Sequence, residues 1–200
     1  MIKLVMGIVL SYFIGAIPSG VIIGKKFKNI DIREHGSKNS GATNAYRVLG
    51  AKLGIIVFIF DVLKGIIPIL IGMSFKIAPH NLVYLGVAAI IGHTFSPYLK
   101  FKGGKGVATS LGVFLILVPK TILFVFGVFA IIVYFSKYIS LGSITAAFLF
   151  PFANYFFYKN NKIEVTILGA LVAAYIIYKH KSNIGRLLKG EENKFNFKKK

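Results

Sequence analysis

The sequence contains no cysteine and no tryptophan, and only six of its 200 residues are acidic. A chain without cysteine forms no disulfide, no thiolate zinc site and no thioester intermediate on its own side chains. The six acidic residues are outnumbered by 25 Lys and Arg residues, which gives a formal net charge of +19 at pH 7. This imbalance predicts an anionic partner, which is a nucleic acid, an anionic lipid or a phosphorylated substrate.

Polar residues are also scarce, since 56% of the chain is hydrophobic and only 16% is charged. A mean hydropathy of +0.72 is typical of an integral membrane protein and far from the composition of soluble domains. Little polar surface is left for a nucleic acid, so lipid headgroups and phosphorylated small molecules remain as expected partners. We predict no nucleic-acid partner, no protein partner and no cofactor.

Seven apolar segments follow one another along the chain, and we predict an all-α integral membrane protein with seven transmembrane helices. These segments are residues 4–24, 53–75, 81–99, 107–118, 121–135, 139–158 and 163–178. The fourth segment is short for a span. An alternative therefore joins residues 107–135 into one long helix that is interrupted by Pro119 and Lys120.

The distribution of cations favours seven spans over this alternative. With seven spans, 19 of the 25 Lys and Arg residues lie on one side of the membrane and five on the other, with Lys64 inside a span. With 107–135 as one span, the split becomes 12 against 11. Because short cytoplasmic loops carry most Lys and Arg, seven spans are predicted, with the amino terminus outside and the carboxyl terminus in the cytoplasm.

We predict a single membrane domain over residues 1–200, with three polar segments on its cytoplasmic side. They are residues 25–52, 100–106 and 179–200, and all three combine small residues with fixed cations. We expect them to converge on one site. The final residues, FNFKKK, are expected to bind anionic headgroups of membrane lipids.

The first polar segment contains the stretch GSKNSGATN, residues 36–44, which has no apolar side chain larger than Ala. Small residues let backbone N–H groups approach an anion closely, and a turn before a predicted short helix at 45–49 would direct the helix dipole at a phosphate. The alternative is a solvated loop with a helix cap. Ala42 stands where a nucleotide-binding P-loop has its Lys, which disfavours nucleotide hydrolysis. The candidate phosphate ligands here are Ser37, Asn39, Gly41, Thr43, Asn44 and Arg47.

The second polar segment, FKGGKG, offers another candidate phosphate cradle. Gly103 and Gly104 free the backbone, and Lys105 supplies a charge just before a helix that is predicted to start near Val107. The alternative is a basic turn between two spans. His93 lies upstream on the cytoplasmic half of the third span, where it is either a satisfied bundle residue or a supporting residue of the site.

Two further groups of polar residues complete the candidates. Asp61 and Lys64 are i and i+3 inside the second span, so each is expected to neutralise the other on a face that points into protein. In the tail, His180, Asn183 and Arg186 recur every three residues and share a helix face, and Glu192 follows. A basic helix beside the membrane that only binds lipid is the alternative there.

Familiar catalytic arrangements are missing from the sequence. No His is followed by Asp in an HxxxxD pattern, no Ser lies in a GxSxG turn, and no metal-binding cluster is recognisable. An enzyme made from these residues is expected to act by positioning its substrates and stabilising charge, not through a covalent intermediate.

The motifs together resemble the bacterial acyl-phosphate:glycerol-3-phosphate acyltransferases, the PlsY family, over nearly the whole chain. The family patterns GSGNxGATNxxR, DxxKG, GHxFxxxLxFxGGKGVAT and HxxNIxRLLxGTE appear, in order, as GSKNSGATNAYR, DVLKG, GHTFSPYLKFKGGKGVAT and HKSNIGRLLKGEE. Two positions depart from these patterns: Lys38 replaces a Gly and Glu191 replaces a Thr, and both add charge.

The resemblance implies acyl transfer from a fatty acyl phosphate to the 1-hydroxyl of glycerol 3-phosphate in the bacterial cytoplasmic membrane. The products are lysophosphatidic acid and phosphate, in the first acylation step of phospholipid synthesis. Catalytic roles are then expected for Lys105, His180, Asn183 and Glu192, with Lys105 at the leaving phosphate. Substrate phosphate would be bound by the first segment, Gly103, Gly104 and Arg186. A carrier for a phosphorylated metabolite is the alternative from another class of protein.

Overall fold

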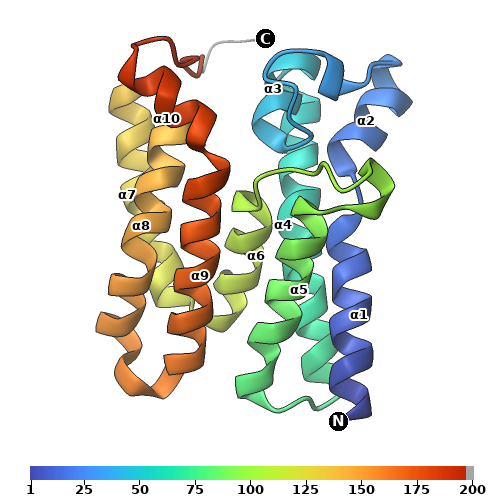
Figure 1. Cartoon of the computed structure of the whole chain (residues 1–200), viewed down its shortest axis with the longest axis vertical. Helices are drawn as coiled ribbons and strands as arrows, with labels where there is room; N and C mark the ends of the chain where they lie inside the picture. The colour runs from blue at the N-terminus through green and yellow to red at the C-terminus, as the bar shows by residue number, and fades with distance from the viewer. Residues whose placement is uncertain (197–200) are drawn as a thin grey trace. The chain divides into compact units, whose positions relative to one another are not determined.

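The computed structural model describes residues 1–196, and the remaining residues of the predicted lipid-binding end, 197–200, lie outside the described part. All regular structure in residues 1–196 is helical, which confirms the predicted all-α class (Figure 1). The chain divides into two compact units, Met1–Ile116 and the part from Leu117 onward. The single domain predicted for residues 1–200 stays a prediction.

Within residues 1–196, five helical stretches are long and apolar enough to cross a membrane. They are α1 and α2 together (Ile2–Lys28), α4 (Ala51–Ser74), α5 with its flanking turns (Pro79–Leu99), α7 (Pro119–Ser136) and α8 (Ile139–Tyr158). A sixth is the pair of α9 (Ile163–Lys179) and α10 (Lys181–Leu188), bent by 55°. The seven apolar segments thus all form helices, but the seven-span count and the orientation stay predictions, because α6 (Val107–Leu117) has only 11 residues.

The first apolar segment is not one helix, because the chain leaves helical geometry after Ala16. α1 (Ile2–Ala16) and α2 (Ser19–Lys28) are separated by Ile17, with ψ 120°, and Pro18. A residue before proline is driven out of the α region by the proline ring, which explains a break at this position. A similar break at Val118, with φ −145°, separates α6 from α7, so residues 107–135 do not form one continuous helix.

In the first unit, α1 packs closely against α5 (Leu82–Thr94) through two glycines (Figure 1). A Cβ atom at Gly15 would lie 2.0 Å from the Ala89 carbonyl oxygen, and one at Gly92 would lie 2.1 Å from that of Tyr12. Any larger residue would separate these helices. The close contact therefore fixes the carboxyl end of α5, which precedes the FKGGKG segment.

The predicted short helix at 45–49 is longer in the structure, because α3 begins at Ala42 and ends at Leu49. Gly41 is its N-cap, so the helix starts inside the polar stretch and not after it. A buried hydrophobic cluster holds α3 in place, and its members are Val21, Ile23, Ile32, Ala45, Leu49, Val57 and Leu99. This cluster attaches the first polar segment to α2 and α4.

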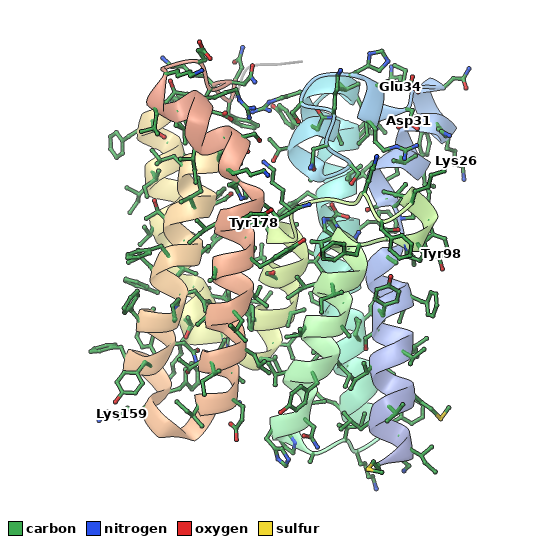
Figure 2. All side chains as sticks on the ribbon, viewed as in Figure 1. Lys26, Asp31, Glu34, Tyr98, Lys159 and Tyr178 are labelled. Carbon is green, nitrogen blue, oxygen red and sulfur yellow. The ribbon has the colours of Figure 1, made fainter. Side chains whose placement is uncertain are left out.

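In the second unit, α8 packs against both α7 and α9. Two hydrogen bonds join the three helices, since Thr121 Oγ1 donates to Asn154 Oδ1 at 2.8 Å and Asn154 Nδ2 donates to Thr166 Oγ1 at 2.8 Å. The chain bends at His180, between α9 and α10. Tyr178, two residues earlier, lies well away from Lys159 along this unit (Figure 2).

Candidate functional site

The first polar segment is held together by Asn44, a side chain that is only 2% exposed. Its Nδ2 donates to the carbonyl oxygens of Ile32, Asn39 and His35 at 2.7, 2.8 and 3.2 Å. Its Oδ1 accepts the Ser37 N–H at 2.8 Å. The sequence predicts Asn44 as a phosphate donor, but in the structure its amide hydrogens point at loop carbonyls. These hydrogen bonds hold the loop in shape, and a role of Asn44 at a substrate phosphate stays a prediction.

The other predicted ligands of this segment surround the start of α3. Asn39 Oδ1 accepts the Gly41 N–H at 2.9 Å, which folds the chain back just before the helix. Ser37 is exposed, and Thr43 and Arg47 are half-buried. Gly41 has no side chain with which to cap α3, and the first backbone bonds of this helix run from the Asn44 and Ala45 N–H groups to the Gly41 carbonyl, each at 3.1 Å. The N–H groups of Ala42 and Thr43 precede these bonds. The arrangement suits an anion at this end of α3.

The glycines of the second polar segment lie directly on the carboxyl end of α5. Gly103 N–H donates to the Thr94 carbonyl and Gly104 N–H to the His93 carbonyl, both at 3.1 Å. Gly104 is buried and Lys105, which follows it, is half-buried. The backbone that leads to Lys105 is therefore fixed by main-chain hydrogen bonds.

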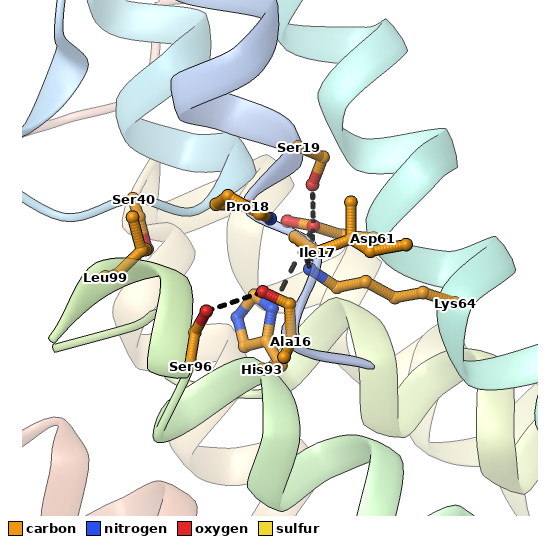
Figure 3. A pocket seen from close by; sticks show the side chains of 10 residues that line it. All are labelled: Ala16, Ile17, Pro18, Ser19, Ser40, Asp61, Lys64, His93, Ser96 and Leu99. Atoms are coloured by element: carbon orange, nitrogen blue, oxygen red, sulfur yellow. Dashed lines mark hydrogen bonds and ion pairs between the residues drawn. The ribbon is translucent and has the colours of Figure 1, made fainter. Parts of the chain in front are cut away.

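The break between α1 and α2 is surrounded by polar side chains, shown in Figure 3. Asp61, Lys64 and His93 among them were predicted from the sequence, whereas Ser19, Ser40 and Ser96 were not. Ser96 Oγ donates to the Ala16 carbonyl at 2.6 Å, and Lys64 Nζ donates to that of Ile17 at 2.9 Å. Ser19 donates to Asp61. These groups line a small cavity, and Ser40 and His93 also lie in its wall.

Asp61 and Lys64 form the ion pair that their spacing predicts, at 2.8 Å. Their side chains are only 2% and 7% exposed, so the pair lies inside the protein. His93 Nδ1 is 3.9 Å from Asp61 Oδ1, and its ring is also buried. The predicted supporting residues Asp61, Lys64 and His93 are thus brought together in the first unit.

The tail motif forms a separate cluster in the second unit. The buried carboxylate of Glu192 accepts from Asn183 Nδ2 at 2.9 Å and from Arg186 Nε at 2.7 Å. Gly190, with φ +72°, turns the chain so that Glu192 reaches back to α10. Only Nε of Arg186 takes part in these contacts, and the two terminal nitrogens of its guanidinium do not.

His180 lies at the bend between α9 and α10 and is buried. Its Nδ1 is 2.8 Å from the Ile176 carbonyl oxygen. A carbonyl only accepts hydrogen bonds, so Nδ1 carries the proton there, and in a neutral ring Nε2 is then unprotonated. Such a ring is able to accept a proton at Nε2.

A further polar group at the end of the first unit was also missed by the sequence reasoning (Figure 2). Arg33 donates to both oxygens of Asp31, at 3.0 and 2.6 Å, and Lys25 Nζ lies 3.8 Å from the same carboxylate. The side-chain hydrogen bond from Arg33 lowers the pKa of Asp31 from 3.8 to about 2. The i, i+2 spacing of the two residues in the sequence was the available signal.

The three motifs fall in both units, two in the first and the third in the second. Their convergence on one site stays a prediction. Among residues 1–196, no group of three or more His, Cys, Asp or Glu side chains is placed to hold a metal ion.

The long apolar helices define the class of multi-pass membrane proteins, and the glycine-rich loops of this chain lie next to cationic residues. Residues 5–190 match the sequence model of the family described as glycerol-3-phosphate acyltransferase. A glycerol-3-phosphate acyltransferase of Fusobacterium nucleatum is 58% identical over 190 residues, covering 95% of this chain and 97% of the relative. One from Trichlorobacter lovleyi is 46% identical, covering 92% and 94%.

Two crystal structures of PlsY, an integral membrane glycerol 3-phosphate acyltransferase, are similar in fold. The glycerol 3-phosphate form has a TM-score of 0.87 at 40% identity, with 96% of each chain covered. The lysophosphatidic acid form has a TM-score of 0.86 at 40% identity, covering 96% of this chain and 95% of that one. The chain belongs to the glycerol-3-phosphate acyltransferase family, and it is a multi-pass membrane enzyme.

Proposed function

We propose that this enzyme transfers a fatty acyl group from acyl phosphate to the 1-hydroxyl of glycerol 3-phosphate. The hydroxyl oxygen attacks the acyl carbonyl carbon and forms the ester bond. The bond from that carbon to the phosphate oxygen breaks, so lysophosphatidic acid and phosphate are released. This reaction is the first acylation step of bacterial phospholipid synthesis.

The observation that carries the proposal is the packing of two glycine-rich loops, each next to a cation, in the first unit. Gly41 opens α3, which carries Arg47 in its second turn, and Gly103 and Gly104 lead into Lys105. Both substrates carry a phosphate, and backbone N–H groups with adjacent cations suit that group. An acyl phosphate is already an activated anhydride, which fits a chain without a recognisable nucleophile.

We assign the residues of the three motifs to separate tasks. Ser37, Thr43 and Arg47 bind one substrate phosphate, while Asn39 and Asn44 hold the loop in shape. Lys105 neutralises the phosphate that leaves the acyl carbon. These roles follow from charge and loop geometry.

In the tail motif, Asn183 and Glu192 orient Arg186, whose remaining nitrogens bind the phosphate of glycerol 3-phosphate. His180 accepts the hydroxyl proton at Nε2, since its Nδ1 is engaged by the Ile176 carbonyl.

We further propose seven spans in the bacterial cytoplasmic membrane, with the amino terminus outside and the three motifs facing the cytoplasm. The distribution of 19 cations against five supports this orientation. Cysteines introduced singly at Lys38, Lys102 and Ser182 are expected to resist an impermeant thiol reagent in intact cells and to react after permeabilisation. Labelling of any of them from outside would contradict the single cytoplasmic site.

The donor is tested with purified protein in detergent micelles. Palmitoyl phosphate or palmitoyl-CoA is supplied with glycerol 3-phosphate, and lysophosphatidic acid and released phosphate are both measured. We expect product from palmitoyl phosphate and little from the thioester, because the small-residue loops suit a bare phosphate. A carrier would show no chemical turnover in micelles, and efficient use of the thioester would refute the proposed donor.

A further inference from the structure

The backbone before Lys105 contacts both the side chain and the main chain of His93 in α5. A Cβ atom added at Gly104 would lie 2.1 Å from His93 Nε2, so it would meet the imidazole ring. A Cβ atom added at Gly103 would lie 2.0 Å from the His93 carbonyl oxygen, so it would meet main chain. Neither glycine has a positive φ, so these contacts are the main obstacle to a side chain at either position.

The imidazole that faces Gly104 has a buried carboxylate on its other side. His93 Nδ1 is 3.9 Å from Asp61 Oδ1. Asp61 is itself held by Lys64 at 2.8 Å and by the hydroxyl of Ser19 (Figure 3). A ring packed between a fixed carboxylate and a fixed backbone loses one of the two contacts if it rotates.

The same buried group reaches the first polar segment. Ser40, in the middle of GSKNSGATN, lines the cavity together with Asp61 and His93. A Cβ atom at Gly20, next to Ser19, would lie 2.3 Å from the Ser40 carbonyl oxygen. Both glycine-rich loops of the first unit therefore pack against the residues around the break between α1 and α2.

We infer that His93 is a positioning residue, whose imidazole is the surface that sets the path of the Gly103–Gly104 backbone and thereby the place of Lys105. The Asp61–Lys64 pair orients the ring. This inference rests on the proposed function for the role of Lys105, but the contact itself is tested without assuming that role.

The test compares Gly104→Ala and Gly103→Ala, each in the unsubstituted protein and in a His93→Ala background. Full-length proteins are purified in detergent, and kcat and KM are measured by lysophosphatidic acid formation. A methyl group at Gly104 would clash with the His93 imidazole and displace the backbone before Lys105, so Gly104→Ala should lower kcat at least about tenfold in the unsubstituted protein. Because residues in contact show non-additive effects, this loss should depend on whether the ring is present. In the His93→Ala background, where the ring is gone, the same change should cost less than about threefold. Gly103→Ala should cost the same in both backgrounds, because His93→Ala leaves the main chain in place.

Equal losses from Gly104→Ala in both backgrounds would overturn the inference, as would rescue of Gly103→Ala. If His93→Ala does not fold, as judged by thermal unfolding, His93→Asn takes its place, since Asn keeps a polar atom near the position of Nδ1 and removes the edge that faces Gly104. The rates are measured with whichever donor the unsubstituted protein uses. A wrong donor therefore changes the reference rate and not the ratios among the variants.

Discussion

Lys38 is expected to make the protein less stable than a glycine would at the same position. Its φ is +57°, the left-handed region, which costs a residue with a Cβ about 1–2 kcal/mol. Glycine avoids this cost, but it raises the conformational entropy of the unfolded chain, which destabilises the fold by about 0.4–1 kcal/mol. Lys38→Gly should therefore stabilise the fold by about 0.5–1 kcal/mol. The family pattern, which has Gly here, is consistent with this conformation.

The measurement is thermal unfolding of the detergent-solubilised protein. For a chain of this size, a stabilisation of 1 kcal/mol raises Tm by about 2–4 °C, so we expect an increase of about 1–4 °C. Lys26→Gly is the matched control, because it removes the same charge from an exposed residue inside helix α2. That change should lower stability by up to about 1 kcal/mol. A Tm that falls in both variants would refute the conformational argument.

Three further outcomes are expected from charged residues. Arg47→Lys or Arg186→Lys should lower activity about tenfold or more, equivalent to about 1.4 kcal/mol, because an ammonium cannot replace a planar fork; unchanged kinetics would remove that arginine from the phosphate site. Lys105→Met should lower kcat on the order of 100-fold with a much smaller change in the KM for glycerol 3-phosphate, since the leaving phosphate gains charge in the transition state. The pKa of Asp31 is lowered from 3.8 to about 2 by Arg33, so this carboxylate stabilises the fold above about pH 4 and loses that effect as the pH falls towards 2. The Tm difference between the unsubstituted protein and Asp31→Asn should shrink over that range, and a constant difference would contradict the assignment.

Local patterns in the sequence predicted the helical class and the buried ion pair, but not the break of the first apolar segment at Ile17 and Pro18. Apolar runs long enough to span a membrane became helices, and Asp61 and Lys64 pair because i and i+3 lie on one face of α4. The start of α3 was predicted three residues late, since Gly41 at the N-cap places Ala42 already in the helix. Polar residues of the loop were therefore assigned to a turn that is in part helical.

Contacts between distant segments were beyond sequence reasoning. Ser19 is 42 residues from Asp61, and Ser96 is 80 residues from Ala16, so no spacing rule links them. For Asn44, a polar residue in a small-residue loop predicts a ligand donor. The three carbonyls that occupy its amide become apparent only once the chain folds back on itself.

The break after Ala16 explains why polar side chains gather between α1 and α2, within otherwise apolar helices. Pro18 has no N–H, and the chain at Ile17 is not helical, so the carbonyls before it lose partners that a continuous helix would give them. An unsatisfied backbone group costs several kcal/mol in hydrocarbon. Ser96 donates to the Ala16 carbonyl, and Lys64 adds a second donor to that of Ile17, which also accepts the Ser19 N–H.

The buried ammonium group of Lys64 in turn needs a counter-ion. A buried cation without a counter-ion is strongly disfavoured, so the donor that Lys64 supplies needs the carboxylate of Asp61 beside it. A carboxylate in turn has lone pairs left to satisfy, and Ser19 and His93 lie around it. The ring of His93 ends against Gly104. The charges inside this unit thus follow, contact by contact, from the break in the first apolar segment, and the last contact reaches the loop that carries Lys105.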